Sequence, residues 1–287
     1  MKPTEFDGAQ VYVVGGSLGI GLAVAQRVAT LGADVTIFAR RREPLEQAAG
    51  AVRAACRRPS QSVAWRQLNV ADHDQVAATM QMLVAERGAP DVLINCAGHA
   101  HPRPFEEITY AQFAETMLVN LHGSWNTVQV LLPHMKQKGR AYIVNTSSVA
   151  GLIGVFGYTD YCASKFALVG FSEALRGELK PHGIAVSVLC PPDTDTPGLE
   201  AENLTKPAET RAISATAKLL SAEAVADALL RGMAREAFLI IPGLESRMSA
   251  LAKRLAPGVV YWVMDRAVAK VRLNTREDAG LNTDRAG

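Results

Sequence analysis

Seven short hydrophobic runs recur along the chain, separated by longer stretches with helical periodicity. The runs are rich in Val and Ile and cover 11–14, 35–38, 63–65, 92–94, 142–144, 184–189 and 238–241. Continuous apolar runs are typical of strands that are covered on both faces, as in a parallel sheet. In the first intervening stretch, the apolar residues recur at the spacing of one helix face: Leu22, Ala25, Val28 and Ala29. The pattern predicts an α/β fold with a doubly wound, seven-stranded parallel sheet, right-handed crossovers and helices on both faces.

Two segments depart from this alternation. Residues 193–220 form a long connection after the sixth run, where we expect a lid over the carboxyl edge of the sheet. Residues 246–273 follow the last run with a helical pattern of their own, and the polar stretch 274–287 is expected to be a flexible tail. The predicted organisation is a main domain over 1–245, with the lid inserted after strand six, then a C-terminal helical extension and the tail.

The composition narrows the class of protein. The 287 residues are 48% hydrophobic and 20% charged, as in a folded globular chain. The 30 Lys and Arg nearly balance the 28 Asp and Glu, and the net charge of +2 excludes a general nucleic-acid binder. No apolar run reaches the roughly 18 residues that span a bilayer, and the N-terminus lacks the apolar core of a secretory signal. The four cysteines are far apart, which argues against a zinc site or a disulfide scaffold and favours the cytoplasm.

A glycine-rich turn, Gly15-Gly16-Ser17-Leu18-Gly19-Ile20-Gly21, follows the first predicted strand directly. Glycines at these places let the chain turn tightly, bring backbone N–H groups close to a pyrophosphate and pack the next helix against the sheet. Because the turn lies between strand one and helix one, it predicts a Rossmann-type dinucleotide site rather than a plain turn.

The end of the second predicted strand favours NADPH over NADH as the dinucleotide. An NAD-binding chain places an acid near this position to hold the ribose 2′-hydroxyl, whereas this chain has Arg40, Arg41 and Arg42. Guanidinium groups suit a 2′-phosphate, to which Ser17 can add a hydroxyl donor. We expect Arg40 to make the main contact, with Arg41 in support. The alternative is a solvated basic start to a helix, which the helix dipole disfavours.

Tyr161 and Lys165 are four residues apart in a helical pattern and therefore share one helix face. An ordinary phenol titrates near pH ~10, too high to exchange protons readily at neutrality. A nearby ammonium favours the phenolate, which would bring Tyr161 into range as a general acid or base. Ser148, at the end of the fifth predicted strand, can hold the carbonyl oxygen that receives the proton. The alternative is a surface Tyr and Lys on an ordinary helix.

Together these motifs resemble the short-chain dehydrogenase/reductase family over about residues 9–241. The matching pieces are Gly15-x-x-x-Gly19-x-Gly21, Asn95-Cys96-Ala97-Gly98, Asn120, Ser148, Tyr161-Cys162-Ala163-Ser164-Lys165 and Pro191-Pro192-Asp193-Thr194-Asp195-Thr196. The resemblance implies four catalytic residues, with Lys165 also binding the nicotinamide ribose and Asn120 in a water-linked proton relay: Asn120, Ser148, Tyr161 and Lys165. It completes the set of candidate cofactor-binding residues: Gly15, Ser17, Leu18, Gly19, Ile20, Gly21, Arg40, Arg41, Asn69, Val70, Asn95, Ala97, Gly98, Tyr161, Lys165, Pro191, Thr194 and Thr196.

Within this set the resemblance implies specific contacts. Asn95, Ala97 and Gly98 are expected beside the adenosine ribose, Thr196 at the nicotinamide carboxamide and Pro191 along the nicotinamide ring. The chain departs from the family pattern at three positions: Val14 replaces a usual Thr, Asn69 replaces an Asp that holds the adenine, and Pro192 replaces a usual Gly. The first two affect cofactor affinity and no catalytic atom, while Pro192 stiffens the base of the lid.

The lid is similar to one branch of this family, the 3-ketodihydrosphingosine reductases, which reduce the C3 ketone of a long-chain base with NADPH. The similarity covers 191–198 and continues through Glu202-Asn203, Lys206-Pro207, Glu209-Thr210 and Ile213-Ser214; the stretch 154–161 before the tyrosine also matches. It implies that same reaction here, on a long-chain ketone lipid. The alternatives are another hydrophobic ketone, such as a steroid or a 3-oxoacyl thioester, and a catalytically silent NADP-binding module.

The extension over 246–273 has six basic residues against one acidic residue, Asp265. One helical stripe in it is apolar, and Trp262 lies off this stripe, whose members are Val260, Val263, Met264, Ala267 and Val271. A basic amphipathic segment with a Trp suits peripheral contact with a membrane surface. The alternative is a helix that packs on its own domain or on a second subunit. The family resemblance implies a homodimer or homotetramer.

A pair of histidines and a pair of aspartates are further candidates for binding. His99 and His101 have no carboxylate or thiol at ligand spacing, so we expect no metal site. Asp193 and Asp195 form a carboxylate pair in the lid, which either meets the ammonium of a long-chain base or caps a lid helix.

Overall fold

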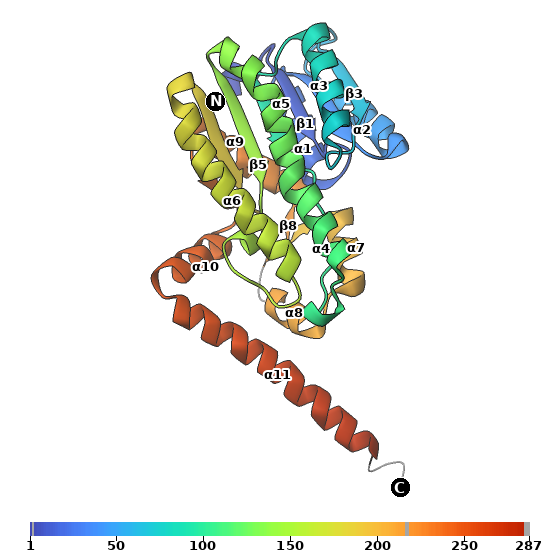
Figure 1. Cartoon of the computed structure of the whole chain (residues 1–287), viewed down its shortest axis with the longest axis vertical. Helices are drawn as coiled ribbons and strands as arrows, with labels where there is room; N and C mark the ends of the chain where they lie inside the picture. Colours follow the sequence, from blue (N-terminus) through green and yellow to red (C-terminus); the bar gives the residue numbers. More distant parts are fainter. Residues whose placement is uncertain (2, 216–217, 284–287) are drawn as a thin grey trace.

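Seven parallel strands form the central sheet, in the order β3-β2-β1-β4-β5-β6-β9 (Figure 1). The computed structural model describes residues 1, 3–215 and 218–283. The strands are β1 (Gln10–Val14), β2 (Asp34–Ala39), β3 (Val63–Gln67), β4 (Val92–Asn95), β5 (Ala141–Thr146), β6 (Ile184–Leu189) and β9 (Leu239–Ile240). The predicted fold is confirmed, with a last strand shorter than its hydrophobic run. The chain order reverses between β1 and β4, and ligands of such sheets bind at the carboxyl ends of the strands around this point.

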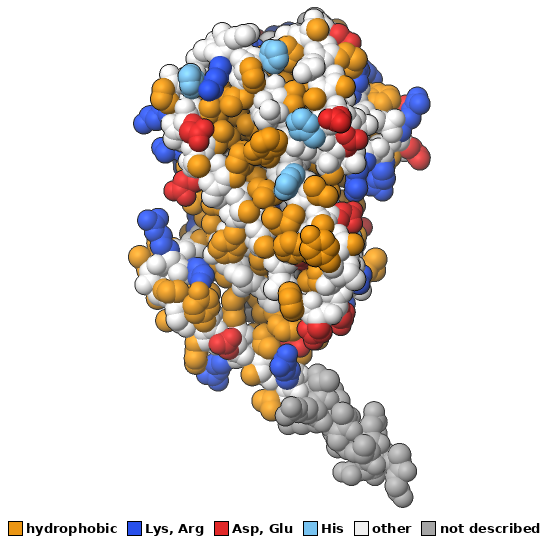
Figure 2. Space-filling model, in the orientation of Figure 1, with side chains coloured by type: hydrophobic (Ala, Val, Ile, Leu, Met, Phe, Trp, Pro, Cys, Tyr) orange, Lys and Arg blue, Asp and Glu red, His pale blue; other side chains and the backbone are white. Residues whose placement is uncertain are grey.

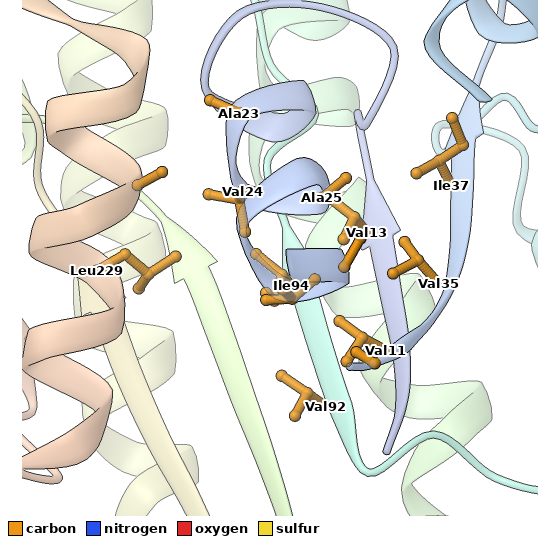
Figure 3. Packing of buried hydrophobic residues seen from close by; sticks show 14 of the residues in the cluster. Val11, Val13, Ala23, Val24, Ala25, Val35, Ile37, Val92, Ile94 and Leu229 are labelled. Atoms are coloured by element: carbon orange, nitrogen blue, oxygen red, sulfur yellow. The ribbon is translucent and has the colours of Figure 1, made fainter. Parts of the chain in front are cut away.

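Alternate residues of each strand enter two hydrophobic cores, one on each face of the sheet. On one face, Val11 and Val13 of β1 and Ile94 of β4 pack against helices α1 (Gly19–Thr30) and α9 (Ala222–Ala234), as Figure 3 shows. On the other face, Tyr12 and Val14 pack against α3 (His73–Arg87), α5 (Gly123–Lys138) and α6 (Thr159–Leu179). Burial on both faces explains why the strands have continuous apolar runs.

The remaining helices of the main domain connect these layers. Helix α2 (Arg42–Ala54) packs beside α1, and α4 (Tyr110–Met117) leads into α5 through one π-helical turn, η3 (Leu118–His122). The described part of the main domain also has four short 3-10 turns: η1 (Pro3–Phe6), η2 (Phe105–Glu107), η4 (Val149–Gly151) and η5 (Lys180–His182).

The connection after β6 folds as a small unit of its own at the carboxyl edge of the sheet. It contains β7 (Thr194–Asp195), α7 (Pro197–Thr205), α8 (Ala208–Ser214) and β8 (Leu220–Ser221), and the two strands pair in parallel. Residues 216–217 of this predicted lid lie outside the described residues.

Two helices follow β9, namely α10 (Leu244–Leu255) and α11 (Pro257–Thr283), and α11 projects away from the main body (Figure 1). The predicted helical extension over 246–273 is thus helical. The stretch 274–287, expected to be a flexible tail, is helical as far as Thr283 because α11 continues through it, and residues 284–287 lie outside the described residues. None of the helices described is long and apolar enough to cross a bilayer.

Candidate active site

At two positions of the glycine turn between β1 and α1, neighbouring backbone atoms lie so close that there is no room for a side chain. Gly15 has φ +81°, and a Cβ there would lie 2.5 Å from the backbone N of Ala97 at the end of β4. A Cβ at Gly21 would lie 2.1 Å from the carbonyl oxygen of Gly15. Leu18, the N-cap of α1, is extended, and no described side chain caps the helix. The N–H groups of the first turn of α1 are therefore available to an anion, which fits a dinucleotide pyrophosphate.

The basic cluster lies beside this turn. The N–H groups of Gly15 and Gly16 donate to the carbonyl oxygen of Phe38 at 2.8 and 3.1 Å, which ties the end of β2 to the turn. Arg40 and Arg41 follow β2, are exposed, and form no ion pair with any residue that the structure describes. Arg42 instead pairs with Glu46 at 2.8 Å. Two of the three guanidinium groups are thus available to a phosphate at the adenosine end of the site.

Ser148, Tyr161 and Lys165 meet at the carboxyl ends of β5 and β6. Ser148 begins the turn after β5; its Oγ accepts from the backbone N–H of Ala150 at 3.1 Å and donates to the carbonyl oxygen of Pro191 at 3.4 Å. Tyr161 and Lys165 project from α6, and the Lys165 Nζ lies 5.5 Å from the centroid of the Tyr161 ring. The predicted catalytic residues are therefore brought together.

Burial shifts the pKa values of Tyr161 and Lys165. Burial raises the pKa of the Tyr161 phenol, the charge of Glu202 raises it further, and a hydrogen bond with Ser148 opposes them. The direction is opposite to the sequence-based expectation that the Lys165 ammonium would favour the phenolate. The reason is that burial of the phenol itself, and after it the charge of Glu202, dominate the pKa of Tyr161. Lys165 is buried too, which lowers its pKa to about 8. A protonated Tyr161 is the form that donates a proton, as reduction of a ketone requires.

Asn120 lies in the π-helical turn η3, a kind of turn that is frequent at functional sites. It is fully buried, and its side chain makes three hydrogen bonds of 2.9–3.0 Å, two with the backbone of His99 and one to the Ser164 Oγ. A Cβ at Gly98 would lie 3.1 Å from the Asn120 Oδ1 and 3.2 Å from the Lys165 Nζ. Asn120 thus reaches the catalytic group beside Lys165, where its role in a proton relay stays a prediction.

The predicted nicotinamide contacts lie at the base of the lid. A Cβ at Gly19 would come within 2.9 Å of the Thr196 Cγ2, so Thr196 packs directly on the glycine turn. Thr196 also caps α7 through the backbone N–H of Leu199 at 3.3 Å. Pro191 follows β6 and accepts from Val149 at 3.0 Å. Thr194 is buried and donates to the carbonyl oxygen of Pro192 at 2.9 Å.

Of three residues expected to contact the adenosine, one is exposed and two are buried. Asn69 is exposed after β3, and Val70 is buried against Gly123. The Asn95 amide is not brought to the cleft: it is 2% exposed and is hydrogen-bonded to Asn145 and Thr127, each at 2.9 Å. Asn95 holds β4 to its neighbours because a buried amide must find such partners.

The structure adds one residue to which the sequence analysis gave no role. Glu202 of α7 accepts a hydrogen bond from the Tyr158 hydroxyl at 2.8 Å, and the Tyr158 ring lies 5.4 Å from that of Tyr161. Glu202 belongs to the part of the lid whose sequence is similar to the 3-ketodihydrosphingosine reductases. No spacing in the sequence, however, relates it to Tyr161 on another helix.

The structure also places the lid carboxylates and the histidine pair. Asp193 pairs with the buried Lys206 at 3.1 Å, whereas Asp195 is exposed. His99 and His101 have ring centroids 5.0 Å apart, and among the described residues no group of three or more His, Cys, Asp or Glu could hold a metal ion.

Comparisons with known proteins agree with this geometry. The family model described as short chain dehydrogenase matches residues 9–207. The chain is 40% identical over 258 residues to a 3-dehydrosphinganine reductase of Danio rerio and 38% identical to a 3-ketodihydrosphingosine reductase of Mus musculus, with 89% of this chain and 78% of each relative covered. A solved short-chain dehydrogenase/reductase from Burkholderia phymatum, in complex with NAD, has a TM-score of 0.78 and 26% identity over 89% of this chain and 96% of that one. On these grounds the chain belongs to the short-chain dehydrogenase/reductase family, the oxidoreductases that bind a nicotinamide cofactor.

Proposed function

We propose that the protein reduces the C3 ketone of 3-ketodihydrosphingosine, or of a close long-chain analogue, to the alcohol with NADPH, a step of sphingolipid biosynthesis. The observation that supports this most is the meeting of Ser148, Tyr161 and Lys165 at the carboxyl ends of β5 and β6, where burial raises the pKa of the phenol. The substrate class is supported by relatives named for this reaction.

The chain's own residues account for how the ketone oxygen is bound and protonated. The bound cofactor supplies a hydride to the carbonyl carbon. The Ser148 hydroxyl orients the carbonyl oxygen, and Tyr161 donates its proton to that oxygen as the negative charge develops. Lys165, fixed by a hydrogen bond of 2.9 Å from its Nζ to the carbonyl oxygen of Thr146, holds a positive charge near the phenol and stabilises the phenolate that remains. The products are the alcohol and the oxidised cofactor, and Tyr161 regains its proton from solvent.

The preference for NADPH is supported by the guanidinium groups of Arg40 and Arg41 beside the glycine turn, which form no ion pair with any residue that the structure describes. Two such guanidinium groups suit the dianionic 2′-phosphate of NADPH, and the end of β2 carries no acid for the 2′-hydroxyl of NADH. The ratio of kcat/KM with the two cofactors measures the preference, and an equal or higher value with NADH would contradict it.

A panel of ketones tests the substrate. We expect the protein with NADPH to convert 3-ketodihydrosphingosine in detergent micelles to the C3 alcohol, identified by mass spectrometry, and to act more slowly on a steroid ketone and a 3-oxoacyl thioester. Activity on the thioester without activity on the long-chain base would overturn the proposed substrate and leave the family assignment in place.

The C-terminal helices suit a lipid substrate because α10 exposes an apolar stripe. Leu244, Met248, Leu251 and Leu255 follow the period of one helix face and are each about half exposed or more, at 74%, 57%, 49% and 73%. In α11, by contrast, the predicted stripe is mostly half-buried toward the protein, which matches the alternative of packing on the chain's own domain.

We therefore assign the peripheral membrane contact to the exposed stripe of α10; Trp262 of the next helix, α11, is also 57% exposed. The basic side chains of both helices favour an anionic lipid surface. Co-sedimentation with vesicles of anionic phospholipid tests this: we expect binding that salt weakens and that Met248→Asp reduces. Equal binding of this variant and the parent would contradict the assignment.

Self-association is proposed through α5 and α6. Trp125 of α5 and Phe166 of α6 are 45% and 43% exposed, and Figure 2 shows hydrophobic side chains gathered on the face formed by these helices. We expect a homodimer or homotetramer by light scattering, and the variant Phe166→Asp to shift it toward the monomer. A monomeric parent protein at micromolar concentration would contradict this proposal.

A further inference from the structure

The lid helix α7 places a carboxylate in the catalytic pocket that the proposed reduction does not use. Glu202 accepts a hydrogen bond from the Tyr158 hydroxyl at 2.8 Å. The Tyr158 ring packs 5.4 Å from the Tyr161 ring, and the charge of Glu202 is felt by both Tyr161 and Lys165. The carboxylate therefore lies beside the group that receives the ketone oxygen.

Glu202 is the acid of the lid that is partly buried without an ion-pair partner among the described residues. Asp193 pairs with Lys206, whose side chain is 3% exposed, and Asp195 faces solvent from β7. No Lys, Arg or His among the described residues lies within ion-pair distance of Glu202. The charges of Lys206 and Lys165 act on this carboxylate from beyond ion-pair distance, and burial nevertheless raises its pKa. A partly buried carboxylate whose hydrogen-bond partner is a neutral hydroxyl is incompletely compensated, so a cation from a ligand would gain interaction energy there.

We propose that Glu202 is the binding site for the ammonium group of a long-chain base. The inference rests on the proposed function, since the ammonium-bearing carbon of 3-ketodihydrosphingosine is bonded directly to the ketone carbon. With the ketone oxygen at Ser148 and Tyr161, the ammonium is held within one carbon of the reacting centre, on the side of Glu202. The Tyr158 hydroxyl orients the carboxylate by its hydrogen bond.

The same arrangement gives the pocket a basis for selectivity. A steroid ketone or a 3-oxoacyl thioester offers no cation beside its carbonyl and leaves the Glu202 charge unpaired in a closed site. A long-chain base supplies that cation, so the interaction discriminates by substrate charge as well as by chain length.

Steady-state kinetics with two ketones of equal chain length test the proposal. One is 3-ketodihydrosphingosine, and the other is its analogue with hydrogen in place of the ammonium group. The parent protein is expected to prefer the charged ketone, and Glu202→Gln is expected to lower that preference in kcat/KM by about 10- to 100-fold, mainly through KM for the charged ketone. Glu200→Gln is the matched control: it removes the same charge from an exposed position of α7 and should keep the parent's preference.

The outcomes separate this inference from the function on which it rests. If the parent protein reduces neither ketone, the proposed function falls and the ammonium site with it. If it reduces the charged ketone and Glu202→Gln keeps the preference, or slows both ketones equally, only the ammonium site is overturned, because Glu202 then acts through Tyr161 alone. Should Glu202→Gln not fold, Tyr158→Phe carries the test: it keeps the carboxylate, loses the orienting hydroxyl and should lower the preference by a smaller factor.

Discussion

The buried Lys165 makes the stability of this protein depend on pH in a predictable way. Its side chain is 4% exposed, and burial lowers its pKa from 10.5 to about 8. Each unit of pKa is worth about 1.4 kcal/mol, so the protonated lysine costs the folded state about 3.5 kcal/mol relative to the neutral one. The cost is complete below about pH 8, where both folded and unfolded chains carry the proton. It disappears as the pH rises toward 10.5, because the folded protein releases this proton before the unfolded chain does.

The variant Lys165→Met removes this titration. We expect the free energy of unfolding of the parent, relative to the variant, to rise by about 2.5 kcal/mol between about pH 7 and about pH 10. The variant also loses the hydrogen bond from Nζ to the carbonyl oxygen of Thr146, but that loss is nearly independent of pH and cancels from the slope. Urea denaturation of both proteins at several pH values measures the difference, since other titrating groups are common to the two.

Parallel curves of stability against pH for the two proteins would refute this reasoning. They would mean that Lys165 keeps an ordinary pKa in the folded state. The raised pKa of Tyr161 would be unaffected, because burial of the phenol and the charge of Glu202 cause it.

Four further predictions concern the cofactor site, helix α2 and the sheet. Arg40→Ala should raise KM for NADPH about tenfold or more and change KM for NADH much less, as steady-state kinetics would show; an equal effect on both would contradict a 2′-phosphate contact. Gly15→Ala should destabilise the protein by at least about 1–3 kcal/mol in thermal unfolding, since its Cβ would lie 2.5 Å from a main-chain nitrogen. Gly50→Ala, in the open middle of α2, should instead stabilise it by up to about 1 kcal/mol. Asn95→Ala should cost about 1–3 kcal/mol, because its two buried hydrogen-bond partners lose their contacts; an unchanged melting temperature would contradict this.

The sequence predicted those parts of the fold that depend on local pattern. The strands could be located because burial on both faces makes each one a continuous apolar run. The glycine turn could be interpreted because its glycines fall between one such run and a helical stretch. Tyr161 and Lys165 could be paired because a helix brings residues four apart to one face.

The features of the site that depend on tertiary contacts could not be predicted from the sequence. Glu202 lies on α7 and meets Tyr158, at the start of α6, only in the folded chain, so no spacing relates Glu202 to Tyr161. The direction of the Tyr161 pKa depends on burial, which the sequence does not specify residue by residue. Asn95 matched a family motif, yet its amide is used within the sheet because the neighbouring strand places Asn145 opposite it.

The most direct test of the account is NADPH oxidation with 3-ketodihydrosphingosine by the parent protein and by Tyr161→Phe. We expect the parent to turn over, and the variant to lose at least about 100-fold in kcat while still binding NADPH, measured by cofactor fluorescence, because only the proton donor is removed. A variant that binds and turns over like the parent would contradict the assignment of Tyr161 as the acid, and with it the central claim about this site.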